Sequence, residues 1–243
     1  MSIVAVDIGN TTHKAAVYEK GQLLDYYSAQ ALSVSVLRQW HQRYKADRLI
    51  FSSVGGTDAA SLKPLEEEKL YRIYQLRELP LPFTSDYQTP ETLGSDRLAC
   101  MIAADELYPG QSVLVVQCGS CLTFDLMHER CYRGGSISPG LAMRFKALSA
   151  FTAKLPLLEP DEQVSLTGRS TASCIQAGVW HGYLSECASM IEKYRSHYEN
   201  LNVILTGGDA EKVNDKLKKT TFAHPNLVLY GLYVILNKHV ENQ

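Results

Sequence analysis

One sequence pattern, a buried strand followed by a glycine turn and a second strand, occurs twice in this chain. The first copy covers residues 3–10 and the second residues 113–120, so the copies stand 110 positions apart. Both begin with a short run of β-branched and other apolar residues, which is typical of a strand buried on both faces. Later in each half, a further predicted strand ends in a pair of glycines, Gly55-Gly56 and Gly207-Gly208. Any two α/β units share some of these features, but the repeat favours a duplicated α/β domain with a cleft between its copies.

The remaining hydrophobic periodicity predicts further strands and helices in both halves. The predicted strands cover residues 2–8, 13–19, 22–28, 48–54, 70–76, 112–117, 121–127, 131–137 and 202–206. The predicted helices cover residues 33–45, 59–69, 95–107, about 141–150, 170–198, 210–217 and 227–239. This order indicates mixed sheets flanked by helices, divided near Pro109. The predicted domains are therefore residues 1–110 and 111–243.

Composition excludes several classes of function. The chain has 243 residues, enough for one large domain or two smaller ones, and its formal net charge is −2. A nearly neutral chain has no general field that would attract nucleic acid or an anionic membrane. The sequence contains no apolar run of the roughly 20 residues that cross a bilayer, and it starts directly with a predicted strand. Most of the six cysteines lie in apolar runs, as reduced thiols do, so a cytoplasmic protein is expected.

The first glycine turn carries a carboxylate, Asp7, at the end of its strand. A buried carboxylate is costly unless it meets a cation or hydrogen-bond donors. Gly9 lets the backbone approach a ligand closely, and Asn10 and Thr11 add donors. This combination suits a polyphosphate bound together with Mg²⁺. The alternative is a tight hairpin turn with a solvated Asp7.

The glycine pair Gly207-Gly208 stands between a predicted strand and a predicted helix. Paired glycines before a helix N-terminus can lie against a nucleotide, because the free N–H groups there attract phosphate. The alternative is an ordinary turn in which Asp209 caps the helix. The glycine-rich segment 134–140 is likewise either a wall of the predicted cleft or purely structural.

A third candidate, residues 94–97 with the sequence Gly-Ser-Asp-Arg, begins a predicted helix after a proline-bearing loop. A helix N-terminus attracts anions, and Arg97 can hold a carboxylate through two parallel hydrogen bonds. Asp96 would then be able to accept a proton from a substrate hydroxyl. An N-cap with a surface ion pair would give the same sequence.

Two further features are interpreted as structural. Cys118 and Cys121 have the C-x-x-C spacing of redox and zinc sites, but no second Cys or His pair stands at metal-binding spacing. They also flank the second glycine turn instead of preceding a helix. The seven histidines are scattered, and none forms a pair typical of a metal site.

The candidate motifs form an ordered set that resembles the type III pantothenate kinases from residue 3 to about residue 232. The motifs are D-I-G-N-T at 7–11, G-S-D-R at 94–97, C-G-S at 118–120, G-G-S-I-S-P-G at 134–140, S-T-A-S-C-I-Q-A-G at 170–178 and T-G-G-D-A at 206–210. The resemblance implies a duplicated ribonuclease H-like fold of the actin/hexokinase/Hsp70 type. It also implies a homodimer that phosphorylates pantothenate with ATP, as the first step of coenzyme A biosynthesis.

The resemblance also assigns roles to residues. It implies Asp96 as the general base, and Asp7 as the residue that organises Mg²⁺, through a bound water. ATP would be bound by Asp7, Ile8, Gly9, Asn10, Thr11, Thr12, His13, Lys14, Gly119 and Ser120, and by the glycine pair Gly207-Gly208. Pantothenate would be bound by Tyr87, Gly94, Ser95, Asp96, Arg97 and Thr171.

The chain departs from the family pattern at one position. The family usually has an aspartate at position 117, where it is associated with a bound K⁺ or NH₄⁺, and this chain has Gln117. The departure predicts an activity that depends only weakly on a monovalent cation. Two alternatives to a pantothenate kinase are kept at this point: another small-molecule kinase of the same fold, and a non-enzymatic ATP-binding regulatory protein.

Overall fold

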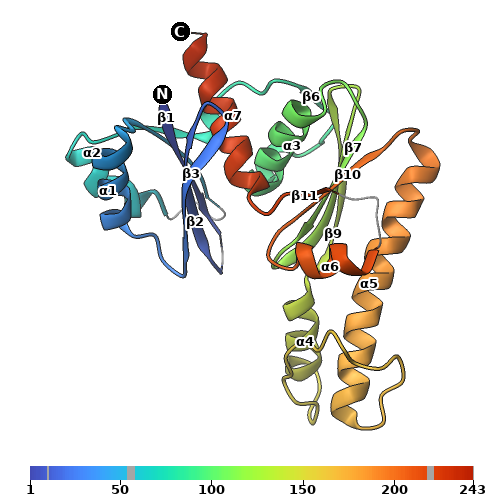
Figure 1. Ribbon diagram of the computed structural model, residues 1–243. Helices are drawn as coiled ribbons and strands as arrows, with labels where there is room; N and C mark the ends of the chain where they lie inside the picture. The colour runs from blue at the N-terminus through green and yellow to red at the C-terminus, as the bar shows by residue number, and fades with distance from the viewer. Residues whose placement is uncertain (10, 54–57, 218–221, 243) are drawn as a thin grey trace. The chain divides into compact units, whose positions relative to one another are not determined.

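The computed structural model describes all residues except 10, 54–57, 218–221 and 243 (Figure 1). The chain divides into two compact units, residues 1–109 with 226–243, and residues 110–225. The sequence-based division put residues 226–243 in the second domain, so the structure corrects it at this end of the chain. The physical reason is the packing of the C-terminal helix, described below.

A five-stranded sheet forms the centre of the first unit. Its strands lie in the order β3-β2-β1-β4-β5, and β1 is antiparallel to β2 and parallel to β4. Their bounds are β1 Ser2–Ile8, β2 His13–Glu19, β3 Gln22–Ala29, β4 Arg48–Ser53 and β5 Arg72–Gln75. The β1 register pairs Asp7 with Lys14 on β2 and with Ser52 on β4. The end of β1 therefore lies between these two residues.

The second unit repeats this arrangement. Its strands lie in the order β9-β8-β7-β10-β11, with β7 antiparallel to β8 and parallel to β10. Their bounds are β7 Val113–Cys118, β8 Cys121–His128, β9 Cys131–Pro139, β10 Asn202–Thr206 and β11 Phe222–Ala223. Each strand takes the place of its counterpart in the first unit, and β7 matches β1 at the predicted offset. The duplicated α/β architecture predicted from the repeat is confirmed.

Helices cover both sheets. Those of the first unit are α1 Val34–Tyr44, α2 Lys63–Glu67, α3 Ser95–Leu107 and α7 Leu227–Glu241. Those of the second unit are α4 Leu141–Ala150, α5 Thr171–His197 and α6 Ala210–Leu217. The predicted helix 59–69 is instead a 3₁₀ turn, Asp58–Leu62, followed by the short α2. Pro64 explains the break, because proline has no N–H to continue a helix and is tolerated in its first turn.

The proline-bearing loop between the strand predicted at 70–76 and the helix predicted at 95–107 contains short ordered pieces. They are 3₁₀ turns at Leu76–Glu78 and Pro90–Thr92 and the two-residue strand β6, Thr84–Ser85. The prolines of this segment limit it to such pieces.

The central strand β1 is buried on both faces. Val4, Val6 and Ile8 pack into a cluster with Leu37 and Trp40 of α1. Side chains alternate across a strand, so Ile3, Ala5 and Asp7 face the opposite side. That side is covered by α7, which contacts β1 and lies along α3 (Figure 1). Asp7 therefore stands on the face of the sheet that carries α3.

A close approach of two backbones joins α7 to α3. A Cβ added at Gly231 would lie 1.9 Å from the carbonyl oxygen of Ala99 and 3.3 Å from the nitrogen of Ala103, so only glycine fits. The Tyr233 ring stacks on Tyr18 of β2, with ring centroids 5.1 Å apart. Its hydroxyl accepts a hydrogen bond of 2.8 Å from the N–H of Gly21. These contacts attach the C-terminal helix to the first unit.

We predict that Gly231→Ala destabilises the protein by about 1–3 kcal/mol, because the new methyl group overpacks a backbone contact. Gly182→Ala on α5 is the matched control, since a Cβ there meets nothing within 4 Å. The control should be neutral or stabilising by about 0.5–1 kcal/mol, the usual gain from replacing a helical glycine. Urea unfolding of both variants measures the difference, and equal stability would contradict the proposed contact.

Candidate functional site

Asp7 is a buried carboxylate at the carboxyl end of β1. Its Oδ1 accepts a hydrogen bond of 2.9 Å from the Ser52 hydroxyl on β4. Burial raises the pKa of Asp7 to about 6, and the nearby charge of Asp96 acts in the same direction, while Ser52 and Lys14 act in the opposite one. Ionisation of Asp7 is therefore unfavourable, and a divalent cation bound beside the carboxylate would offset that cost.

The second carboxylate, Asp96, lies in the first turn of α3. Gly94 precedes the helix, and a Cβ added there would come within 2.5 Å of the Asp96 Oδ1. Glycine at this position therefore leaves the carboxylate its place beside the helix N-terminus, where the helix dipole favours a negative charge. Both carboxylates belong to the first unit, and the negative charge of Asp96 helps to raise the pKa of Asp7.

Arg97, the next residue on α3, is buried with only 5% of its surface exposed. Its guanidinium carbon lies 5.8 Å from the ring centroid of Tyr87, within the range of a cation–π contact. The structure thus brings Tyr87 and Arg97 together, two residues that the resemblance assigned to one substrate. A buried guanidinium supported by an aromatic ring is suited to holding a carboxylate.

Arg77 anchors the loop that leads into α3, and sequence reasoning missed it. Its Nε donates to the Ser95 hydroxyl at 3.2 Å and its Nη1 to the carbonyl of Pro90 at 3.1 Å. Its Nη2 also donates to the carbonyl of Leu93. One side chain thereby fixes both ends of the last turn before Asp96. The available signal was an arginine at the start of a proline-bearing loop, which does not reveal its partners.

In the second unit, glycines bring three turns into backbone contact at the end of β7. A Cβ on Gly140 would lie 2.1 Å from the carbonyl oxygen of Gly119. A Cβ on Gly207 would lie 2.4 Å from the carbonyl oxygen of Cys118, and Gly207 has a positive φ of 98° that other residues rarely adopt. The structure therefore gathers the predicted phosphate-binding turns 119–120 and 207–208 with the glycine-rich segment before α4.

The carbonyl group of Cys118 contacts the segment that follows β10. It accepts a hydrogen bond of 3.1 Å from the N–H of Asp209, while the N–H of Gly119 donates to the carbonyl of Cys121 at 3.0 Å. Asp209 forms an ion pair with Lys212 at 3.3 Å. Ser120 and Gly208 are exposed beside these contacts, so their polar groups are accessible to a ligand.

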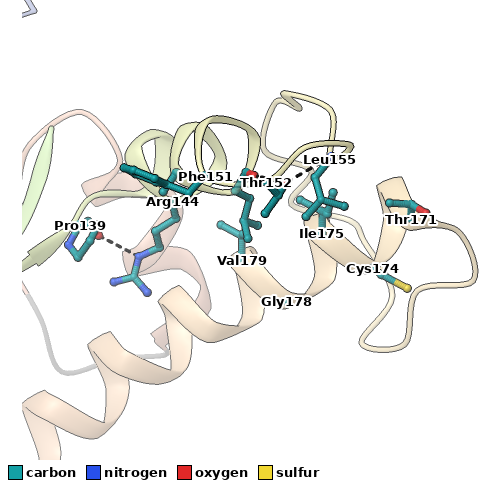
Figure 2. Close-up of a pocket in the computed structure, with 12 residues that line it drawn as sticks. Pro139, Arg144, Phe151, Thr152, Leu155, Thr171, Cys174, Ile175, Gly178 and Val179 are labelled. Atoms are coloured by element: carbon teal, nitrogen blue, oxygen red, sulfur yellow. Dashed lines mark hydrogen bonds between the residues drawn. The ribbon is translucent and has the colours of Figure 1, made fainter.

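Thr171 lies in the second unit, at the first position of α5. The capping box of Ser170 and Ser173 begins this helix, in which each side chain bonds to the other residue's backbone. Thr171 lines a largely apolar groove of about 920 Å³ between α4 and α5, together with residues such as Phe151 and Ile175 (Figure 2). The other residues assigned to pantothenate belong to the first unit.

The remaining predicted residues have these positions. His13 and Lys14 are on β2, opposite Ile8 and Asp7. Gln117 is the next-to-last residue of β7 and pairs in register with Thr206 on β10. Thr11 and Thr12 lie in the turn after β1. Asn10 and the pair Gly55-Gly56 lie outside the described residues.

Cys118 and Cys121 lie on either side of the second glycine turn, at the end of β7 and the start of β8. Cys118 is buried, Cys121 is half-buried, and neither forms a disulfide. In the part of the chain that the structure describes, no group of three or more His, Cys, Asp or Glu side chains is placed to hold a metal ion. Among the same residues, no helix has the length and apolar character needed to cross a membrane.

Comparison with known proteins identifies a family. The model of the type III pantothenate kinases matches residues 3–193. The chain is 41% identical over 233 residues to the type III pantothenate kinase of Phocaeicola vulgatus, covering 96% of each chain. It is 38% identical over 241 residues to that of Christiangramia forsetii, covering 96% of this chain and 97% of the relative.

Solved structures share the fold at low sequence identity. A Baf family protein of Campylobacter jejuni, described as a transcriptional activator, has a TM-score of 0.64 at 21% identity, covering 98% of this chain and 99% of its own. A protein of Sinorhizobium meliloti, described as a putative 2-dehydro-3-deoxygalactonokinase, has a TM-score of 0.57 at 12% identity, with the same coverage. These likenesses concern the fold alone and confirm the predicted class, in which sugar kinases also occur.

We predict that Asp7→Asn stabilises the ligand-free protein above about pH 6. In the folded chain Asp7 keeps its proton up to about pH 6, whereas the unfolded chain releases it near the ordinary pKa of 3.8. The folded state binds more protons between these values, so its stability decreases as the pH rises through this window. The neutral Asn avoids that loss, which amounts to about 2–3 kcal/mol at 1.36 kcal/mol per pKa unit.

Urea unfolding with EDTA and without nucleotide, from about pH 4 to about pH 7.5, measures this difference. The gain of the Asn variant should shrink towards the acid end. Asp47→Asn is the control, because its side chain is 61% exposed and surface substitutions usually change stability by less than about 0.5 kcal/mol. An Asp7→Asn variant that is less stable than the parent at neutral pH would contradict the prediction.

Proposed function

The chain belongs to the type III pantothenate kinase family, and we propose that it transfers the γ-phosphoryl group of ATP to the primary hydroxyl of pantothenate, the first step of coenzyme A biosynthesis. The observation that carries the proposal is that Asp96 and the buried Arg97 stand next to each other in the first turn of α3. Pantothenate carries a carboxylate for Arg97 and a hydroxyl for Asp96. A coupled assay of ADP release, with and without pantothenate, tests it. ADP release that is independent of pantothenate would overturn it.

In this mechanism Asp96 is the general base. It accepts the proton of the pantothenate hydroxyl as the oxygen attacks the γ-phosphorus and the bond to the β-phosphate oxygen breaks. Phosphoryl transfer has a loose transition state, so positioning and charge neutralisation matter more than a strong base. Arg97, held over Tyr87, fixes the far end of the substrate, and the hydrogen bonds of Arg77 hold the turn from which Asp96 projects.

We assign Mg²⁺ to the Asp7 carboxylate, through a bound water. The raised pKa of Asp7 supports this assignment. Burial and the negative charge of Asp96 both make ionisation of Asp7 unfavourable, and a bound cation would offset both effects. Mg²⁺ is typically bound by one or two carboxylates together with phosphate oxygens and waters, which fits this residue set. When bound, the ion would neutralise charge on the phosphates of ATP.

We assign the phosphates of ATP to the turns at Gly119-Ser120 and Gly207-Gly208, and to the turn that follows Asp7. Backbone N–H groups at a helix N-terminus favour phosphate, and α6 begins at Ala210, one residue beyond the pair Gly207-Gly208. The close backbone contacts of these turns support the assignment, since they hold the donors in place before a ligand arrives.

We also propose that the protein is a cytoplasmic homodimer. The apolar groove between α4 and α5 supports self-association, because its rim exposes 88% of Phe151. Leu157 and Leu166, in the loop between the two helices, are 56% and 77% exposed. A second copy that covers these side chains would also cover Thr171, which lines the same groove.

We predict that Asp96→Asn lowers kcat by about 10²–10⁴-fold, the usual contribution of a general base, while the fold stays intact. Asn keeps the shape and removes the proton-accepting charge. Glu106→Gln on the same helix is the matched control, because Glu106 pairs with Lys238 at the other end of α3. Steady-state kinetics and circular dichroism measure both variants. Near-normal turnover in the Asn variant would exclude Asp96 as the base.

We predict that K⁺ and NH₄⁺ activate the enzyme only weakly. Gln117 offers a carbonyl dipole and an NH₂ group but no negative charge to balance a buried cation. Rates in KCl, NH₄Cl and NaCl at equal ionic strength measure the effect without differences in screening. Gln117→Asp should introduce activation by K⁺ over Na⁺. Strong K⁺ activation of the parent enzyme would contradict this interpretation of Gln117.

A further inference from the structure

We propose that Arg144 and Glu186 are positioning residues for the nucleotide. They fix the turn that contains Gly140, and through Gly140 they fix the Gly119-Ser120 turn that is assigned to the phosphates. This inference rests on the proposed function of Ser120. It adds two residues that stand 42 positions apart in the sequence.

The first link is between Gly140 and the phosphate turn. The N–H of Gly140 donates to the carbonyl of Ser120 at 3.2 Å. A Cβ on Gly140 would lie 2.1 Å from the carbonyl oxygen of Gly119 and 2.6 Å from that of Ser120. With backbones in such close contact, a displacement of Gly140 must displace Ser120 as well.

The second link is between Arg144 and the residues just before Gly140. The Arg144 Nε donates to the carbonyl of Pro139 at 2.8 Å, which Figure 2 marks with a dashed line. Its Nη2 donates to the Ser138 hydroxyl at 3.4 Å. Arg144 is one turn into α4, and its N–H also bonds the Gly140 carbonyl at 3.1 Å. The side chain therefore clamps the turn from the helix that follows it.

The third link brings in α5. Glu186 receives the Ser138 hydroxyl on Oε1 at 2.5 Å and forms an ion pair with the Arg144 Nη2 through Oε2. The Arg144 guanidinium carbon also lies 5.1 Å from the ring centroid of Tyr183, one turn earlier on α5. Both charged side chains are mostly buried, with 20% and 29% of their surfaces exposed.

Such a pair is more than a surface ion pair. Exposed pairs contribute little, but a charge left unpaired in a mostly buried site is costly. If either side chain is removed, the other loses its ion-pair partner and is no longer held in position. The residues before Gly140 would then lose hydrogen bonds from these side chains. Because the clamp acts on the backbone beside Ser120, its loss should weaken nucleotide binding and leave pantothenate binding unchanged.

Calorimetry with ATP, in the absence of pantothenate, measures the nucleotide effect directly. Arg144→Ala should weaken ATP binding about 10-fold or more, since small misplacements of binding groups have effects of this size. In steady-state kinetics the KM for ATP should rise by the same factor, and the KM for pantothenate should change less than about twofold. Glu186→Gln keeps an acceptor for Ser138 and should retain part of the affinity, which gives a test even where the Ala variant folds poorly.

Arg195→Ala is the matched control. Arg195 pairs with Glu192 near the C-terminal end of the same helix α5. It should bind ATP like the parent. The effect of Arg144→Ala should also be smaller when Ser120 is already Ala, because residues that act through one another are not additive.

Three results would overturn the proposal. They are unchanged ATP affinity in both Arg144→Ala and Glu186→Gln, full additivity with Ser120→Ala, and a rise in the KM for pantothenate in place of the KM for ATP. Failure of the proposed function is distinguishable, because it would appear as absent pantothenate-dependent turnover in the parent protein, whereas ATP binding by calorimetry needs no turnover.

Discussion

The burial of the two central strands is the constraint on which the rest of the structure depends. β1 and β7 are covered on both faces, and apolar positions such as Ile3, Val4, Val113 and Leu114 are 0% exposed. Strands of this kind have no place for a functional group along their length, because an unpaired polar side chain there would be costly. Polar side chains on these strands stand only at or near their ends: Ser2 at the amino end of β1, where its hydroxyl donates to Glu19, and Asp7 and Gln117 near the carboxyl ends, where parallel neighbours also end. The site residues of both units therefore lie just after or beside these strand ends.

Glycines near these strand ends allow the backbones of neighbouring turns to come into direct contact. The turns at 119–120, 139–140 and 207–208 come so close that any side chain on Gly140 or Gly207 would overlap a carbonyl group. Backbone donors fixed in this way need no reorganisation when an anion binds, which is the main physical advantage of such a site. The same closeness makes the turns depend on whatever holds their flanks. In this chain those are long-range side-chain contacts such as the Arg144–Glu186 pair.

Local pattern was sufficient for the strands, for most helices and for the duplication, because period and turn residues are encoded within a few positions. It was not sufficient for contacts between distant segments. The attachment of α7 to the first unit depends on Gly231 meeting Ala99, and a lone glycine in an apolar helix does not identify its neighbour. Likewise, the sequence around Arg77 does not identify the three oxygen atoms to which its side chain donates hydrogen bonds. The motifs and their order identified the candidate site residues, whereas the roles of Ser52 and Arg77, which support them, are evident only from the structure.

Equivalent positions in the two units differ in charge: one holds a carboxylic acid and the other a neutral amide. Asp7 and Gln117 occupy the same place at the ends of β1 and β7, and their register partners on β4 and β10 are both hydroxyl residues, Ser52 and Thr206. In the first unit the carboxylate stays, at a cost in stability, and Asp96 adds a second negative charge nearby. This unit is suited to a metal ion and to accepting a proton. In the second unit Gln117 is neutral, so no fixed charge at this position would repel a phosphate at the Gly119-Ser120 turn, where we propose that ATP binds. A carboxylate at position 117 would need a cation to offset that repulsion, and under this proposal a glutamine would not.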